Sequence, residues 1–173
     1  MSEIKFDGTI PMSPAEREQL INFIIDVQKL YKKHGNKNRF LYDCFNAIIR
    51  PLTLNIGQYN NCKVSKAVKE RMGEFKNIRE FDRKKTGKNI IKEHVKPLEV
   101  LLEEFYQGFN NKDAENWFDS CEIAFITKEE DVELREAEKE IRLRKDSKSV
   151  YDIHKEAYKK TGLDKKLEKF KIK

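Results

Sequence analysis

His94 is the side chain of this sequence whose type and position most favour chemistry. The chain has three histidines, and imidazole exchanges a proton near neutral pH. His34 falls in a predicted turn, and His154 lies beside Lys155 on an amphipathic helix, so both are interpreted as solvated surface histidines. His94 instead directly follows Glu93 at the end of a short β-prone segment and precedes Pro97 by three residues. We therefore take Glu93 and His94 as the starting point for a functional site.

The segment Glu93-His94-Val95-Lys96-Pro97-Leu98 resembles the opening of the ββα-metal motif of HNH-type endonucleases. The resemblance implies that Glu93 binds a metal ion and that His94 is the general base. Neighbouring residues of a strand face opposite ways, so a bend at the strand end is needed to bring both side chains to one site. A divalent ion there would stabilise the charge of a phosphodiester transition state.

The segment from Ile123 to Asp131 resembles the second strand and the helix of the same motif. In many HNH sequences the position of Asp131 carries the last metal-binding histidine, so the resemblance implies Asp131 as the second ligand. Carboxylates favour Mg2+ or Mn2+. The sequence departs from the family in having no C-x-x-C pairs and only Gly108 in the region of the Gly-rich loop. The mid-motif asparagine has three candidates, Asn110, Asn111 and Asn116.

Each half of this motif also has an ordinary structural interpretation. His94 can be a strand-end histidine bonded to the backbone, with Glu93 paired to a lysine. Residues 128–131 can be a helix N-terminus rich in acids, which the helix dipole favours.

Charge is divided among three segments. Residues 63–96 hold 12 Lys and Arg against 5 Asp and Glu, residues 98–141 hold 4 against 14, and residues 155–173 hold 8 against 3. The basic segments permit binding of a polyanion, with DNA as the expected partner. Alternatively, the acidic segment 98–141 pairs with the basic ones or binds a partner protein. The residues expected near phosphates are Arg83, Lys84, Lys85, Lys88, Lys92 and Lys96.

Helical periodicity dominates the sequence. Ser13, Pro14 and Glu16 are typical of a helix start, and apolar residues then recur until Gly35. Residues 55–61 read as a loop and 81–88 as a turn. The lysine-rich C-terminal tail is expected to fray. The pattern predicts helices over 14–34, 39–51, 64–78, 98–106, 114–119, 128–144 and 150–160, and strands over 89–95 and 122–127.

These elements predict an α+β fold, predominantly α-helical, in which N-terminal helices pack against a small strand–helix–strand–helix unit. The regions are 1–80 (helical), 81–146 (HNH-like, with a helical insertion) and 147–173 (a helix and a basic tail), together one compact domain. No segment is apolar enough to span a membrane, and the start does not resemble a signal peptide. Three cysteines argue against a disulfide framework, so a cytoplasmic location is expected.

Two functions remain open on the sequence. The first is a metal-dependent HNH-like nuclease from a restriction or mobile-element system, using Mg2+ or Mn2+. The second is a non-catalytic protein that binds nucleic acid or acts as a phage-type inhibitor through its charged surfaces.

Overall fold

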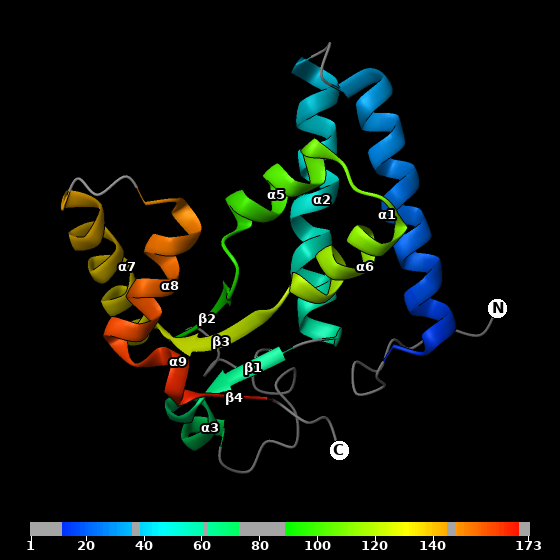
Figure 1. The fold of residues 1–173 in the computed structure, drawn as a ribbon. Helices are drawn as coiled ribbons and strands as arrows, with labels where there is room; N and C mark the ends of the chain where they lie inside the picture. The colour runs from blue at the N-terminus through cyan, green and yellow to red at the C-terminus, as the bar shows by residue number, and fades with distance from the viewer. Residues whose placement is uncertain (1–11, 36–38, 61, 73–88, 145–147, 170–173) are drawn as a thin grey trace.

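A small mixed sheet lies between two groups of helices (Figure 1). The computed structural model describes residues 12–35, 39–60, 62–72, 89–144 and 148–169. The predicted class, α+β and predominantly helical, is confirmed. None of the described helices combines the length and the apolarity needed to cross a membrane.

The first helical group contains α1 (Pro14–His34), α2 (Arg39–Asn60), α5 (Leu98–Gln107) and α6 (Asn111–Ser120). α1 begins as predicted, because the Ser13 side chain accepts from the Glu16 backbone while the Glu16 carboxylate accepts from the Ser13 backbone. Asn110 caps α6 through its side-chain oxygen. The core between these helices is built on Ile24, Leu101 and Phe105, all fully buried.

α2 is longer than predicted. It continues through Pro51 to Asn60, so the predicted end near Pro51 and the predicted loop over 55–61 are wrong. Its burial is uneven, because Phe40, Cys44 and Ile48 are exposed. The second half of α2 packs on two sides: Ile56 is almost fully buried in the core between the helices, and Leu54 packs against the cluster that contains Val64 and Phe125 of the sheet.

Gly57 is the point of closest approach between α2 and β3. A Cβ atom at this position would lie 2.3 Å from Ile123 Cγ1 and 2.7 Å from the Cys121 carbonyl oxygen. We therefore expect Gly57→Ala to lower the free energy of unfolding by about 1–3 kcal/mol, despite the better helix propensity of alanine. Urea unfolding measures the change. Asn55→Ala, an exposed change in the same helix, should be at least as stable as the wild type, and equal stability of both variants would contradict the packing argument.

The sheet has the strand order β2-β3-β1-β4. β2 (Ile90–His94) and β3 (Ile123–Thr127) confirm the two predicted strands and pair antiparallel. β1 (Cys62–Ser65) overlaps the start of the predicted helix over 64–78, of which α3 (Lys66–Met72) forms a part and residues 73–78 lie outside the described residues. β4 (Leu167–Lys169) lies in the tail that was expected to fray. Both strands exist because of pairing distant in sequence: β1 pairs parallel with β3 and antiparallel with β4.

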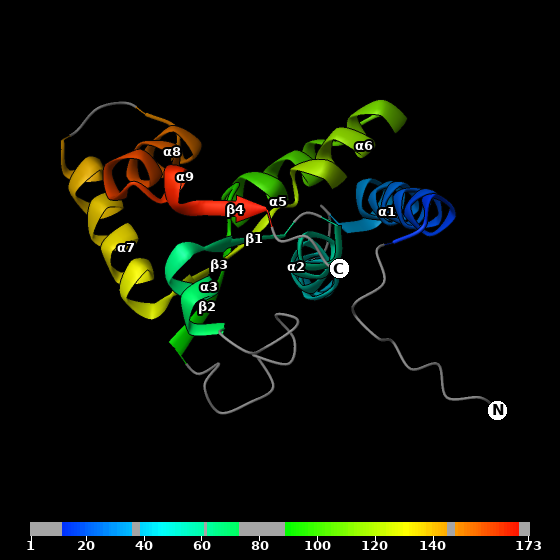
Figure 2. The same ribbon diagram turned by 90° about the horizontal axis from the view of Figure 1, so that it is seen from below.

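The second helical group covers one face of the sheet. It contains α7 (Lys128–Leu143), α8 (Val150–Thr161) and α9 (Leu163–Lys166), which lie on the opposite side of the strands from α1 and α2 (Figure 2). Ala124 and Ile126 face α7 and α8, whereas Ile123 and Phe125 face the other side. α7 confirms the helix predicted over 128–144 and begins with a capping box formed by Thr127 and Glu130.

Ion pairs join the basic and acidic segments. Lys63 Nζ lies 2.8 Å from Glu122, and Arg71 Nη2 lies 3.2 Å from Glu129. The described residues thus include pairs of the kind expected if the acidic segment neutralises the basic ones. The exposed pair of Arg71 and Glu129 contributes little to stability, about 0–1 kcal/mol.

Candidate functional site

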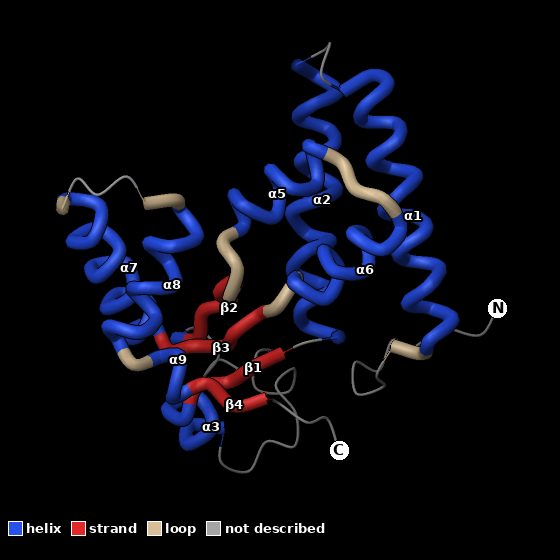
Figure 3. The backbone as a smooth tube through the Cα atoms, viewed as in Figure 1, coloured by secondary structure: helices blue, strands red, loops and turns tan. Residues whose placement is uncertain are grey.

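The strands β2 and β3 and the helix α7 form a continuous strand–strand–helix unit (Figure 3). α5 and α6 are inserted between the two strands, and β3 leads directly into α7. In the antiparallel register Glu93 lies opposite Ala124 and His94 lies opposite Ile123. Glu93 therefore belongs to the α7–α8 face of the sheet, and His94 to the face against α2.

Although they leave the strand on opposite faces, Glu93 and His94 line one cavity of about 410 Å³. This is possible because β2 ends at His94 and the chain bends before α5 begins. We call this space the His94 cavity. It is lined by Arg50, Glu93, His94, Pro97, Leu98, Glu99, Leu102, Glu138, Arg142, Val150 and His154.

The protonation of His94 follows from its hydrogen bonds. Its Nε2 lies 3.1 Å from the Thr53 hydroxyl oxygen, and the Thr53 hydroxyl donates to the Arg50 carbonyl at 2.9 Å. Because the hydroxyl has one proton, His94 Nε2 must be the donor of the first bond. Nδ1 then carries the lone pair, and it has no hydrogen-bond partner among the described residues. Burial, aided by the nearby His154, lowers the pKa of His94 to about 4, so the ring is neutral at pH 7.

Thr53 is fully buried in α2 and holds the His94 ring in this tautomer. We expect Thr53→Val, which keeps the shape of the side chain, to lower the free energy of unfolding by about 1–3 kcal/mol, because the His94 N–H loses its acceptor. Urea unfolding measures the loss. Thr53→Ser is the matched control that keeps the hydroxyl and removes the methyl group. A larger loss in Thr53→Ser than in Thr53→Val would show that packing, and not the hydrogen bond, fixes this contact.

Glu93 has the opposite electrostatic character. It is partly buried, and burial raises the pKa of its carboxyl to about 7. The charge of His154 lowers this pKa, whereas the negative charges of Asp131 and Glu138 raise it further. Near neutral pH a large share of Glu93 is therefore protonated. The cavity thus holds an imidazole and a carboxyl group that are adjacent in sequence, and the order of their pKa values is the reverse of the order in water.

His154 is buried, at 4% exposure, so its interpretation as a solvated surface histidine is wrong. Its Nε2 donates to the His94 carbonyl at 3.2 Å, and its Nδ1 contacts the Glu138 carboxylate. A ring that carries a proton on each nitrogen satisfies both acceptors. The hydrogen bond from His154 holds the pKa of Glu138 below its usual value. Through these two contacts, His154 of α8 binds both Glu138 of α7 and the end of β2.

Asp131 is placed differently from Glu93. It is buried near the start of α7, and its carboxylate pairs with Arg135 at 3.0 Å. It influences the pKa of Glu93 but does not line the His94 cavity. Within the described ranges, no three Asp, Glu, His or Cys side chains are arranged to hold a metal ion. The donor types suit Mg2+ or Mn2+, but the arrangement of these residues does not fit the metal site that the resemblance implies.

The residues predicted to lie near phosphates are also dispersed. Lys92 Nζ lies 5.7 Å from the centre of the Phe125 ring, on the face of the sheet against α2. Arg83, Lys84, Lys85 and Lys88 lie outside the described residues. The cations that do line the His94 cavity are Arg50 and Arg142, which the sequence analysis did not single out.

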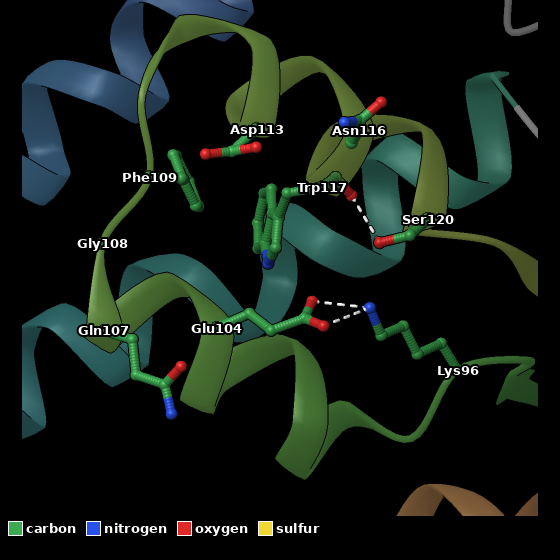
Figure 4. Close-up of a pocket in the computed structure, with 9 residues that line it drawn as sticks. All are labelled: Lys96, Glu104, Gln107, Gly108, Phe109, Asp113, Asn116, Trp117 and Ser120. Carbon is green, nitrogen blue, oxygen red and sulfur yellow. Dashed lines mark hydrogen bonds and ion pairs between the residues drawn. The ribbon is translucent and has the colours of Figure 1, made fainter.

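Lys96 lies in a second cavity, of about 270 Å³, between α5 and α6. Its ammonium group lies 2.5 and 2.6 Å from the two carboxylate oxygens of Glu104 (Figure 4). Trp117 forms part of the wall and donates to the Leu101 carbonyl at 2.8 Å. Asn116, a candidate for the mid-motif asparagine, lines this cavity and not the His94 cavity. Because Lys96 and Trp117 already have partners, the second cavity is the weaker candidate for catalysis.

Comparisons of the chain with family models, with curated proteins and with solved structures find no match. The functional argument therefore depends on the geometry of the His94 cavity.

Proposed function

We propose that the protein is an HNH-like nuclease that hydrolyses phosphodiester bonds of nucleic acid in the His94 cavity. The observation that carries the proposal is the meeting of four groups in one space: His94, Glu93 and the two arginines Arg50 and Arg142. Neither arginine forms an ion pair with another described residue. A phosphodiester carries one negative charge, and guanidinium groups bind phosphate oxygens through paired N–H donors.

In the proposed reaction, water attacks phosphorus and breaks its bond to the leaving sugar oxygen. His94 Nδ1 accepts the proton of the attacking water, and the carboxyl group of Glu93 donates a proton to the leaving oxygen. Arg50 and Arg142 stabilise the negative charge that develops on the phosphoryl oxygens. The lowered pKa of His94 and the raised pKa of Glu93 support this division into base and acid.

The pairing of Asp131 with Arg135 favours a second candidate. In it, the chain keeps the strand–strand–helix unit without catalysis and binds nucleic acid, or a protein partner through the acidic segment 98–141. Part of that segment is already occupied, since Glu122 and Glu129 pair with basic residues of the chain itself.

The test is cleavage of supercoiled plasmid and of end-labelled single-stranded oligonucleotides by the full chain. Parallel reactions contain Mg2+, Mn2+ or EDTA, so that dependence on a divalent cation is measured directly. The proposal expects nicked or shortened products. Intact substrates in all three conditions, together with retained DNA binding in a gel-shift assay, would overturn it in favour of the binding protein.

A further inference from the structure

A groove lined by tyrosines adjoins the His94 cavity. It has a volume of about 870 Å³ and runs between α5 and the start of α8. Tyr42, Tyr106 and Tyr151 line it, and the rings of Tyr42 and Tyr106 lie 5.4 Å apart. The groove shares Arg50 and Val150, among others, with the His94 cavity, so the two spaces are neighbours. We call it the tyrosine groove.

A lysine-rich pocket adjoins this groove at Tyr151. It has a volume of about 230 Å³, and Tyr151 lines both spaces. Lys155 and Lys159 line the pocket and form no ion pair with a described residue, whereas Lys63 pairs with Glu122 at 2.8 Å. Its lining contains one acid, Asp164. We call it the lysine pocket.

The helix α8 connects the three spaces. Tyr151, Lys155 and Lys159 follow one another at intervals of four residues, so they form one exposed stripe along the helix. His154, which lines the His94 cavity, packs against Tyr158 of the lysine pocket with ring centroids 4.7 Å apart. A ligand that follows the stripe therefore passes from the lysines to Tyr151 and on to the His94 cavity.

The order of these groups matches the chemistry of an unpaired nucleic-acid strand. Bases of a single strand stack on aromatic side chains, while the backbone follows cationic groups. In a duplex the base faces are covered by neighbouring pairs and cannot stack on tyrosine. Tyr151 is 41% exposed and offers such a surface. Glu99 and Glu103 also line the tyrosine groove, where carboxylates repel phosphates but accept hydrogen bonds from base amino groups.

We propose that the lysine pocket and the tyrosine groove bind single-stranded nucleic acid, with phosphates at Lys155 and Lys159 and an unpaired base on Tyr151. This inference rests on the proposed function, since it names the substrate class of the same site. It predicts that single strands bind more tightly than a duplex of the same sequence.

The experiment is fluorescence anisotropy of the full chain with labelled 20-mers of single-stranded DNA, single-stranded RNA and duplex DNA in EDTA. At least tenfold tighter binding of single strands is expected. Tyr151→Ala should weaken that binding by about tenfold, and Lys155→Gln with Lys159→Gln should reduce the slope of log K against log salt by about 1.4. Lys165→Gln is the control, because this exposed lysine of α9 does not line the pocket.

Hydrolysis of bis(p-nitrophenyl) phosphate by the same variants separates this inference from the proposed function. This substrate is a phosphodiester without a nucleic-acid strand, so its turnover reports on the His94 cavity, and Lys165→Gln should hydrolyse it at the wild-type rate. Equal affinity for duplex and single strands, or unchanged affinity in Tyr151→Ala, would overturn the single-strand inference alone. Tight single-strand binding without hydrolysis of any phosphodiester would instead overturn the nuclease and leave the binding surface standing.

Discussion

Replacing His94 with glutamine is expected to reduce phosphodiester cleavage by about 10²- to 10⁴-fold, the usual contribution of a general base. Glutamine can still donate a hydrogen bond to Thr53, which accepts from His94 Nε2 in the wild type. It has no unprotonated ring nitrogen with which to accept a proton from water. The loss should therefore appear in the turnover number, with the folded structure preserved.

The control for this variant is His34→Gln, which changes an exposed histidine at the end of α1. Its cleavage rate should equal that of the wild type. Circular dichroism and thermal unfolding establish that both variants are folded. Full activity in a folded His94→Gln protein would remove His94 from the reaction and with it the proposed mechanism.

Glu93→Gln is expected to lower the cleavage rate at pH 6 by about 10²-fold, because the amide cannot donate the proton that the leaving oxygen needs. The carboxyl group acts as an acid only while protonated, and its pKa is about 7. Wild-type activity should therefore fall as pH rises through about 7, and this decline should be absent from the residual activity of Glu93→Gln. Glu99→Gln, an exposed carboxyl of the same cavity, is the control and should keep the decline.

The same variant has a signature in stability that does not depend on catalysis. The folded protein favours the protonated form of Glu93, so this residue destabilises the fold increasingly as pH rises from about 4.5 to about 7. Glu93→Gln removes that effect, and its stability relative to the wild type should increase over this range. Urea unfolding at pH 5 and pH 7 measures the difference. A constant difference between the two proteins would contradict the burial argument for Glu93.

Local signals predicted much of the secondary structure. The capping residues Ser13 and Thr127 mark the starts of α1 and α7, because each satisfies backbone donors within its own first turn. β1 and β4 could not be read in this way. β1 is a strand because it pairs with β3, and β4 is a strand because it pairs with β1. Both pairings join residues that are far apart in the sequence, so no local pattern indicates them.

The residues of the candidate site likewise divide into those that a local sequence pattern marks and those that no local pattern marks. Glu93 and His94 were found because they are adjacent and precede a proline. Arg50, Glu138 and Arg142 were missed because they reach the cavity from α2 and α7, and no local pattern sets them apart from other charged helix residues. His154 did carry a signal: it lies among Ile153, Ala157 and Tyr158 on the buried stripe of α8.

The assignment of the His94 cavity to phosphodiester hydrolysis is tested most directly by the pH dependence of kcat/KM for bis(p-nitrophenyl) phosphate with the wild-type protein. The base must be unprotonated and the acid protonated, and their pKa values are about 4 and about 7. We expect a bell-shaped profile with its maximum between these values, near pH 5.5. A rate that rises steadily through pH 7, or no hydrolysis at any pH, would contradict the assignment of this cavity to phosphodiester hydrolysis.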